Sequence, residues 1–249
     1  MPITPTSAWA DLERAFTDKL SLERAPVAVT FCETVPDGVR KFEGSAPSGC
    51  TFGKVAATEA AGRSAFYTVG ADHLNCPIGA YTHNIPPADG GAMLNEMLGM
   101  MAGLGYVKME EVPQIPRWPS TPAAIVYARL GDTPAAPDVV IFACRASAAM
   151  LLGEAARAAG AASALPPLPR PTCMAVPAAA AQGATMSLGC IGNRVYTGVD
   201  DDSIYLMVRG ADLARVAGAL DTIAHANAQL AAFHRDRRPG LTAGDAARS

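Results

Sequence analysis

Six cysteines are the residues of this 249-residue chain whose chemistry is most open to inference. Four thiolates can hold a [4Fe–4S] cluster or a zinc ion, and one activated thiol can act as a nucleophile. The cysteines are far apart in sequence, and no Cys-x-x-Cys pair marks a metal site. Three uses therefore stay open: metal or cluster binding, which the following patterns favour, buried structural thiols, and thiol-based catalysis.

The cysteines form three pairs that occur in the same order in two halves of the chain. Two apolar runs end in cysteine, two cysteines open alanine-rich segments that end on glycine, and two are followed by Ile-Gly and then Tyr-Thr. The pairs are Cys32 with Cys144, Cys50 with Cys173, and Cys76 with Cys190. Repetition of this kind predicts an internal duplication, with two related α/β halves packed around a pseudo-twofold axis as one globular unit.

Four of these cysteines are the predicted ligands. Cys50 and Cys173 are expected at helix N-termini, where the helix dipole favours the thiolate. Cys76 and Cys190 are expected after strands, and each is trailed by a glycine that lets the backbone bend around a bound group. We therefore predict one shared site with a [4Fe–4S] cluster, or zinc as the alternative, and redox or small-molecule chemistry.

The remaining cysteines and two histidines are interpreted differently. Cys32 and Cys144 end apolar strands, so we expect them in the core. His73 and His83 lie on either side of Cys76, and either could complete a metal site. A histidine in a surface loop is the commoner case and is the interpretation we favour for both.

Arg194 suggests a second class of function, a non-metal module that binds a small anionic ligand. Its guanidinium lies beside a glycine-bent turn and can form a paired hydrogen bond with a carboxylate or phosphate. A salt bridge that ties down the turn explains the residue equally well. Other residues of the repeated motif are expected to line the same cavity: Asn75, Gly79, Tyr81, Gly192, Asn193 and Tyr196.

Alternating helix and strand patterns position these residues and predict an α/β fold, with α+β as the alternative. Trp9, Leu12, Phe16 and Leu20 recur at helical spacing and predict a docking helix. The expected organisation is the docking helix at 1–24, a first half at 25–111, a proline-rich crossover at 112–122, a second half at 123–233 and a frayed tail at 234–249.

A methionine-rich stripe runs from Met93 to Leu104 and predicts an amphipathic helix. Methionine fills irregular gaps in protein cores, so packing into the core is the favoured interpretation over a ligand surface. The same apolar face leaves room for a homodimer.

Composition excludes several classes of partner. Only 17% of residues are charged and the net charge is -3, so the chain has no basic field for nucleic acid or an anionic membrane. The N-terminus lacks a signal-peptide pattern, and no apolar run approaches the roughly 20 residues of a membrane span. A cytoplasmic protein with reduced cysteines is expected, acting on a small-molecule ligand or a redox partner.

Motifs spread along the chain resemble those of the domain of unknown function 169 family of bacteria and archaea. The motifs are Pro26-Val-Ala-Val29, Asn75-Cys-Pro-Ile-Gly79, Pro137-Asp-Val-Val140 and Ser187-Leu-Gly-Cys-Ile-Gly-Asn-Arg194. The resemblance extends from about Leu12 to Leu230, and Gly-Cys-x-Gly-x-Arg is its most specific element. It implies a prokaryotic, cytoplasmic protein and bears on the fold more than on the function.

Overall fold

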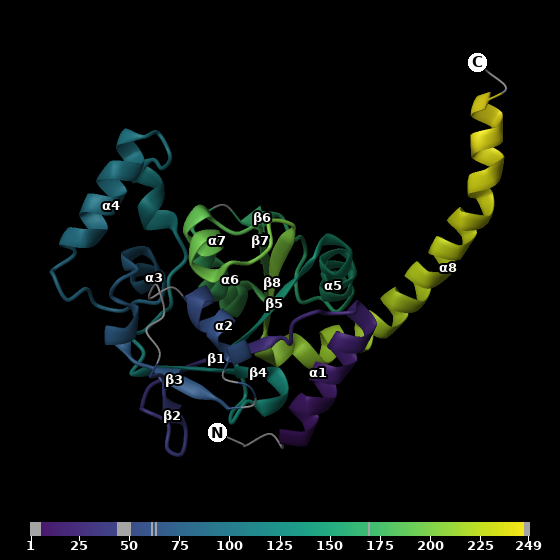
Figure 1. Ribbon diagram of the computed structural model, residues 1–249. Coiled ribbons are helices and arrows are strands. Elements are labelled where there is room, and N and C mark those ends of the chain that lie inside the picture. The colour runs from purple at the N-terminus through teal and green to yellow at the C-terminus, as the bar shows by residue number, and fades with distance from the viewer. Residues whose placement is uncertain (1–5, 44–50, 61, 63, 169, 247–249) are drawn as a thin grey trace.

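A mixed eight-stranded sheet with helices on both faces organises the chain (Figure 1). The computed structural model describes residues 6–43, 51–60, 62, 64–168 and 170–246. In sheet order the strands are β2 (Arg40–Lys41), β3 (Phe66–Thr68), β4 (Ala124–Arg129), β1 (Val27–Cys32), β5 (Val139–Arg145), β8 (Ser203–Arg209), β7 (Ala184–Ser187) and β6 (Pro167–Leu168). This architecture confirms the predicted α/β fold.

The strand order is the same on both sides of the sheet's centre. β1 and β5 pair antiparallel in the middle, with Val27 opposite Ile141. Moving outwards, each is followed by two antiparallel neighbours, β4 and β3 on one side and β8 and β7 on the other, and then by a parallel edge strand, β2 or β6. Two related halves would give such an order, and their origin by duplication stays a prediction.

Strand pairing places the boundary between the halves later than the sequence suggested. β4, expected in the second half at 123–233, pairs with β1 and β3, so the change of side falls between Arg129 and Val139 rather than at 112–122. The prolines of that segment do interrupt regular structure. The prolines do not determine the strand pairing of the segment that follows them, which is β4, and β4 pairs with the edge of β1 that β5 leaves free.

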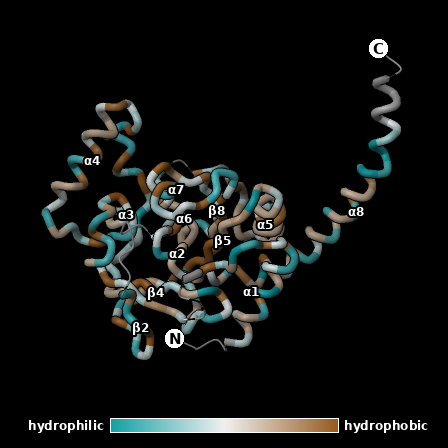
Figure 2. Tube along the Cα trace, in the orientation of Figure 1, coloured by the Kyte–Doolittle hydropathy of each residue, from teal (hydrophilic) through white to brown (hydrophobic). Residues whose placement is uncertain are grey.

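The two faces of the sheet carry separate cores, because side chains alternate along each strand. On β5, Val140 and Phe142 join the core beneath α1, α5 and α8, while Val139 and Ile141 join the core beneath α2 and α6. Figure 2 shows the hydrophobic colouring concentrated along these central strands.

The helices are α1 (Thr6–Leu20), α2 (Thr51–Ala60), α3 (Pro77–Thr82), α4 (Ala92–Gly103), α5 (Ala146–Ala158), α6 (Ala175–Gln182), α7 (Ile191–Thr197) and α8 (Leu213–Ala246), with short 3-10 turns η1 (Gly70–His73), η2 (Met109–Gln114), η3 (Leu130–Asp132), η4 (Thr172–Met174) and η5 (Gly210–Asp212).

The N-terminal helix α1 docks on the sheet through the predicted stripe. Trp9, Phe16 and Leu20 are buried, and the Phe16 ring meets the Phe142 ring edge-on at 5.0 Å between centroids. Helical spacing alone was enough to identify this face.

The methionine-rich helix α4 differs from its predicted role. Of the predicted stripe, Leu98 is buried, Leu94, Met97 and Met101 are half-buried, and Met93 and Leu104 are exposed, at 46% and 77%. The helix packs against α3, which is half its length, and extends away from the sheet (Figure 1). A short partner covers part of α4, so the stripe is only partly buried and full core packing holds for Leu98.

The last helix, α8, leaves the body of the protein and continues to Ala246, although residues from His234 were expected to fray (Figure 1). Up to Phe233 its sequence is rich in alanine and leucine, which have high helix propensity, and the helix then continues through Pro239 and Gly240. Leu230 and Phe233 lie exposed on the projecting part. Within the described part of the chain, neither α8 nor any other helix combines the length and apolarity needed to cross a membrane.

Candidate functional site

Three of the four predicted cysteine ligands come together on the α2 and α6 face of the sheet. Cys173 lies buried in η4, and Cys76 and Cys190 lie half-buried at the starts of α3 and α7. Both of these cysteines act electrostatically on the Cys173 thiol. Cys50 lies outside the described residues, but Thr51 directly after it begins α2, which contacts α7.

The two half-buried cysteines have equivalent backbone positions. Each is the N-cap of a short helix, and its carbonyl accepts the first helical hydrogen bond, from Ala80 N at 2.9 Å after Cys76 and from Arg194 N at 3.1 Å after Cys190. The paired sequence motifs thus give the same local structure in both halves. Because α3 packs against η4, the first of these turns is brought next to Cys173.

The protonation of Cys173 differs from the expectation. Burial raises the pKa of this thiol far above its ordinary value, and the nearby Cys76 and Cys190 raise that pKa further. A hydrogen bond with the Thr82 side chain acts in the opposite direction and lowers the pKa. Loss of solvation therefore outweighs any effect of a helix N-terminus. The isolated site keeps Cys173 protonated, and a bound cation would displace that proton.

Within the described residues, no three His, Cys, Asp or Glu side chains form a group that could hold a metal ion. Cys76, Cys173 and Cys190 thus interact electrostatically but do not by themselves form a metal-binding group, and the fourth predicted ligand, Cys50, lies outside the described residues.

Cys32 and Cys144 are separated from this cluster by the sheet. Cys144 is 6% exposed in the core beneath α1, α5 and α8, and burial raises its pKa to about 11. Cys32 is half-buried at the end of β1, where burial and then the nearby Asp138 carboxylate raise its pKa. Cys144 is a core residue as expected, while Cys32 is only partly covered.

A buried hydrogen-bond chain links the cysteine cluster to the start of α2. Thr82, the hydrogen-bond partner of Cys173, places its Oγ1 2.9 Å from His83 Nδ1. On the other side of the ring, His83 Nε2 lies 2.6 Å from Thr51 Oγ1. The Tyr127 hydroxyl donates to the same Thr51 oxygen at 3.4 Å. The chain therefore connects the surroundings of Cys173 with the residue that follows Cys50.

The surroundings of His83 fix its tautomer. Burial lowers its pKa to about 4, so the imidazole is neutral near pH 7, with one donor and one acceptor nitrogen. Nδ1 lies 2.8 Å from the Gly79 carbonyl, which can only accept, so Nδ1 carries the hydrogen. Nε2 then accepts from the Thr51 hydroxyl. His83 thus ties α3 to α2, the two helices that begin next to Cys76 and Cys50.

Both histidines are buried, which corrects the expectation of surface histidines. His83 and His73 are 0% and 1% exposed, and their rings stack with centroids 6.3 Å apart. His73 Nε2 lies 2.8 Å from Thr68 Oγ1. Each has a threonine partner in the core, and those contacts account for their positions.

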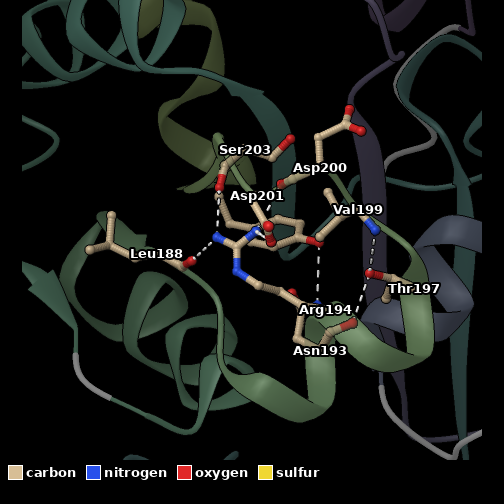
Figure 3. A network of polar contacts seen from close by, with 9 residues as sticks. Leu188, Asn193, Arg194, Thr197, Val199, Asp200, Asp201 and Ser203 are labelled. Carbon is tan, nitrogen blue, oxygen red and sulfur yellow. Dashed lines mark hydrogen bonds and ion pairs between the residues drawn. The ribbon is translucent and has the colours of Figure 1, made fainter.

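Arg194 holds its own loop together (Figure 3). Its guanidinium donates to three backbone carbonyls, Leu188 O at 2.6 Å, Asp200 O at 2.8 Å and Ser203 O at 3.3 Å, and forms an ion pair with Asp201 at 3.7 Å. These donors are the ones that a bound carboxylate or phosphate would need. Of the two interpretations that the sequence left open, the contacts favour the structural brace.

The other predicted ligand residues lie at several places in the structure. Asn75 and Tyr196 are exposed, and a Cβ on Gly192 would lie 3.6 Å from the Tyr196 ring of the same helix. The Tyr81 ring lies under the Arg117 guanidinium and lines a separate pocket between α3 and α4. Asn193 alone is buried beside Cys190, at 1% exposure, and Gly79 supplies the carbonyl that His83 contacts.

Comparison with known proteins agrees with the resemblance seen in the sequence. Residues 15–219 match the family model of DUF169, described as uncharacterised ArCR. The chain belongs to the DUF169 family. The DUF169 match includes all four predicted ligand cysteines and ends within α8, before the projecting part of that helix. No curated protein and no solved structure matches the chain.

Several site residues of this DUF169 chain were missed at the level of sequence. Thr51 and Lys54 follow Cys50 closely, and Lys54 is a buried lysine with its ammonium 4.5 Å from the Phe42 ring centroid. An ionisable residue next to a candidate ligand on a predicted buried helix was an available signal. Thr82 belongs to the repeated Tyr-Thr motif after Cys76, but its contact with Cys173 joins distant segments and could not be inferred from that motif.

Proposed function

We propose that this DUF169 protein binds a sulfur-ligated cofactor between its two halves, first an iron–sulfur cluster and, as the alternative, zinc. The observation that carries the proposal is the electrostatic contact of Cys76 and Cys190 with Cys173. These cysteines come from both halves and from three separate turns, so the fold itself gathers them. Clustered thiols suit soft metals, with tetrahedral zinc and iron–sulfur clusters as the common cases.

The hydrogen-bond chain supports Cys50 as the fourth ligand. Thr51 is the next residue along the chain, and its hydroxyl is fixed by His83 and Tyr127 near the surroundings of Cys173. Four cysteines complete the ligand set of either group. A bound cation would also remove the proton that burial keeps on Cys173.

Redox or small-molecule chemistry follows from this proposal, with a small ligand or a redox partner as the counterpart. Cys76 and Cys190 are half-buried and so keep part of their surface in contact with solvent. A cytoplasmic setting fits the proposal as well, because the thiols must stay reduced until the cofactor binds.

Metal analysis of anaerobically prepared protein tests the proposal. The chain is purified without oxygen, reconstituted with ferrous iron and sulfide, and assayed for iron, sulfide and zinc per chain. We expect a stoichiometric cofactor in the wild type and its loss in Cys76→Ser and Cys190→Ser. Cys144→Ser is the matched control, since its thiol lies on the opposite face of the sheet and the cofactor should remain.

Two results would overturn the proposal. One is a wild-type protein that takes up neither iron nor zinc. The other is a Cys190→Ser protein that keeps the full wild-type content.

A further inference from the structure

A small pocket lies between α3, the start of α4 and the segment that joins them. It encloses about 150 Å³. A cavity of about this size can hold a benzene-sized group, and it is too small for a drug-sized ligand. Most of its wall is apolar, and the wall includes Leu74, Pro77, Ala80, Ile85, Met93 and Leu94. The pocket therefore suits a small apolar group.

The first turn of α4 supplies one wall of this pocket. Met93 and Leu94 open the apolar stripe of α4, and both line the pocket. Met93 is exposed, so core packing does not account for it. A methionine side chain adapts to the shape of its neighbours and makes favourable contacts with aromatic rings. A ligand surface, the less favoured interpretation of the stripe in the sequence, fits this end of it.

Arg117 adds a cationic group that is held in place at the pocket. Its Nε donates to the Tyr81 carbonyl at 3.0 Å, its Nη2 donates to Asn84 Oδ1 at 2.7 Å, and the guanidinium lies 4.4 Å from the centroid of the Tyr81 ring. These contacts leave Nη1 without a hydrogen-bond partner in the described part of the chain. A guanidinium that is already oriented loses little freedom when it binds an anion.

The backbone of Asn84 supports a binding role for this arginine. Asn84 has a left-handed conformation, with a φ of 56°. Residues other than glycine keep this conformation where their surroundings require it, and such positions are common at ligand sites. Here the residue holds Arg117 through its side chain.

Asp89 is the other charged residue of the lining, and its carboxylate is already used. Oδ2 accepts from the Met93 amide at 2.8 Å, and Oδ1 accepts from the Gly91 amide at 2.9 Å. These hydrogen bonds hold the pKa of Asp89 below its ordinary value. A cationic ligand would compete with two amides for this carboxylate, whereas an anionic ligand meets an unpaired N–H of Arg117. The lining thus favours an anion.

We propose that this pocket binds a small carboxylate whose apolar body is about the size of a benzene ring. The apolar body packs between α3 and Met93, and the carboxylate pairs with Arg117. Small-molecule sites commonly divide the work in this way, with apolar walls that bury the ligand and a few polar groups that orient it. The assignment does not rest on the proposed cofactor, and a chain without iron or zinc leaves it intact.

Titration with phenylacetate tests the assignment, followed by NMR of protein labelled at its methionine methyl groups. The Met93 signal, identified by its loss in Met93→Leu, should shift in a saturable way because the bound ring lies beside it. A ligand of this size should have a Kd on the order of 1 mM. Met150 on α5 is the control, because it is similarly exposed, at 54% against 46% for Met93, and its signal should stay in place.

Analogues and variants test the charged and apolar contacts separately. Phenylacetamide, which keeps the ring without the charge, and phenethylamine, which reverses the charge, should each bind about tenfold more weakly than phenylacetate or weaker still. Arg117→Gln should weaken phenylacetate binding about tenfold and leave phenylacetamide unchanged. Arg157→Gln, at an exposed arginine of α5, should alter neither.

The apolar contact is tested by filling the pocket. Ala88→Phe places a ring at the pocket wall and should abolish phenylacetate binding, whereas Ala226→Phe, at an exposed alanine of α8, should not. Any of three results would overturn the assignment: a Met93 signal that does not shift with phenylacetate, phenylacetamide that binds as tightly as phenylacetate, or full phenylacetate affinity in Arg117→Gln or Ala88→Phe.

Discussion

Acidification should test the buried state of His83 directly. The imidazole is fully buried and neutral, with Nδ1 donating to the Gly79 carbonyl and Nε2 accepting from Thr51. Protonation would add a charge in the core and would turn the Thr51 contact from donor–acceptor into donor–donor. The folded protein therefore resists protonation at this site, and the unfolded chain does not.

The magnitude follows from the two pKa values. Burial lowers the pKa of His83 from its ordinary 6.5 to about 4 in the folded protein. Between these values the unfolded chain binds more protons than the folded one, so stability is full above pH 6.5 and falls as the pH falls toward 4. At 1.36 kcal/mol for each pH unit, this one residue should cost about 3 kcal/mol of unfolding free energy by pH 4.

Urea unfolding of the wild type and His83→Gln between pH 7.5 and 4 measures the effect. Glutamine does not titrate, so the variant should be less stable at pH 7.5 and should close the gap by about 3 kcal/mol at pH 4. Carboxylates titrate in both proteins and cancel in the difference. The matched control is Leu230→Ala, because Leu230 is exposed on α8 and the change removes no titratable group, so its gap to the wild type should stay constant. A constant gap for His83→Gln would refute the buried neutral imidazole.

Three further predictions concern stability. Arg194→Ala should lower the unfolding free energy, measured by urea titration, by about 2 kcal/mol because three carbonyls lose their donor, and Arg194→Lys should recover part of this loss. The control Arg157→Ala, at an exposed arginine, should cost under about 0.5 kcal/mol in the same titration. Phe16→Ala should cost about 3–5 kcal/mol, since that ring is fully buried between α1 and β5, whereas exposed Leu230→Ala should change the urea midpoint little. Above its ordinary pKa of 9.0 the Cys173 thiol ionises in the unfolded chain but stays protonated in the folded one. The cofactor-free wild type should therefore lose stability from about pH 9 upwards more steeply than Cys173→Ala does. Parallel curves of stability against pH for the two proteins would contradict the raised pKa.

The fold was predictable where a pattern repeats or is periodic. The pairing of Val27–Cys32 with Val139–Cys144 identified the two strands that meet at the centre of the sheet. Helical spacing identified the buried face of α1. These signals are local, and local periodicity decides which element forms and which side it buries.

The position of each element relative to the others was less predictable. Nothing near Ala124 indicates that β4 inserts beside β1, because strand pairing joins segments far apart in sequence. The stripe on α4 is apolar but packs against the short α3, and Met93 and Leu104 at its two ends are exposed. Periodicity gives the direction of an apolar face and not the size of the partner that covers it.

The candidate site shows both limits at once. Cys76, Cys173 and Cys190 were found because each has a counterpart in the other half, and their convergence on one face follows from the symmetric strand order. Among the residues that surround them, Thr82 belongs to the repeated Tyr-Thr motif, whereas Thr51 and Lys54 have no such counterpart. Cys76 is followed three residues later by Gly79, whereas the same step from Cys190 reaches Asn193, whose amide is buried and half paired. The repetition therefore identified the predicted ligands, whereas neighbouring residues that differ between the halves, such as Lys54, were found only from the structure.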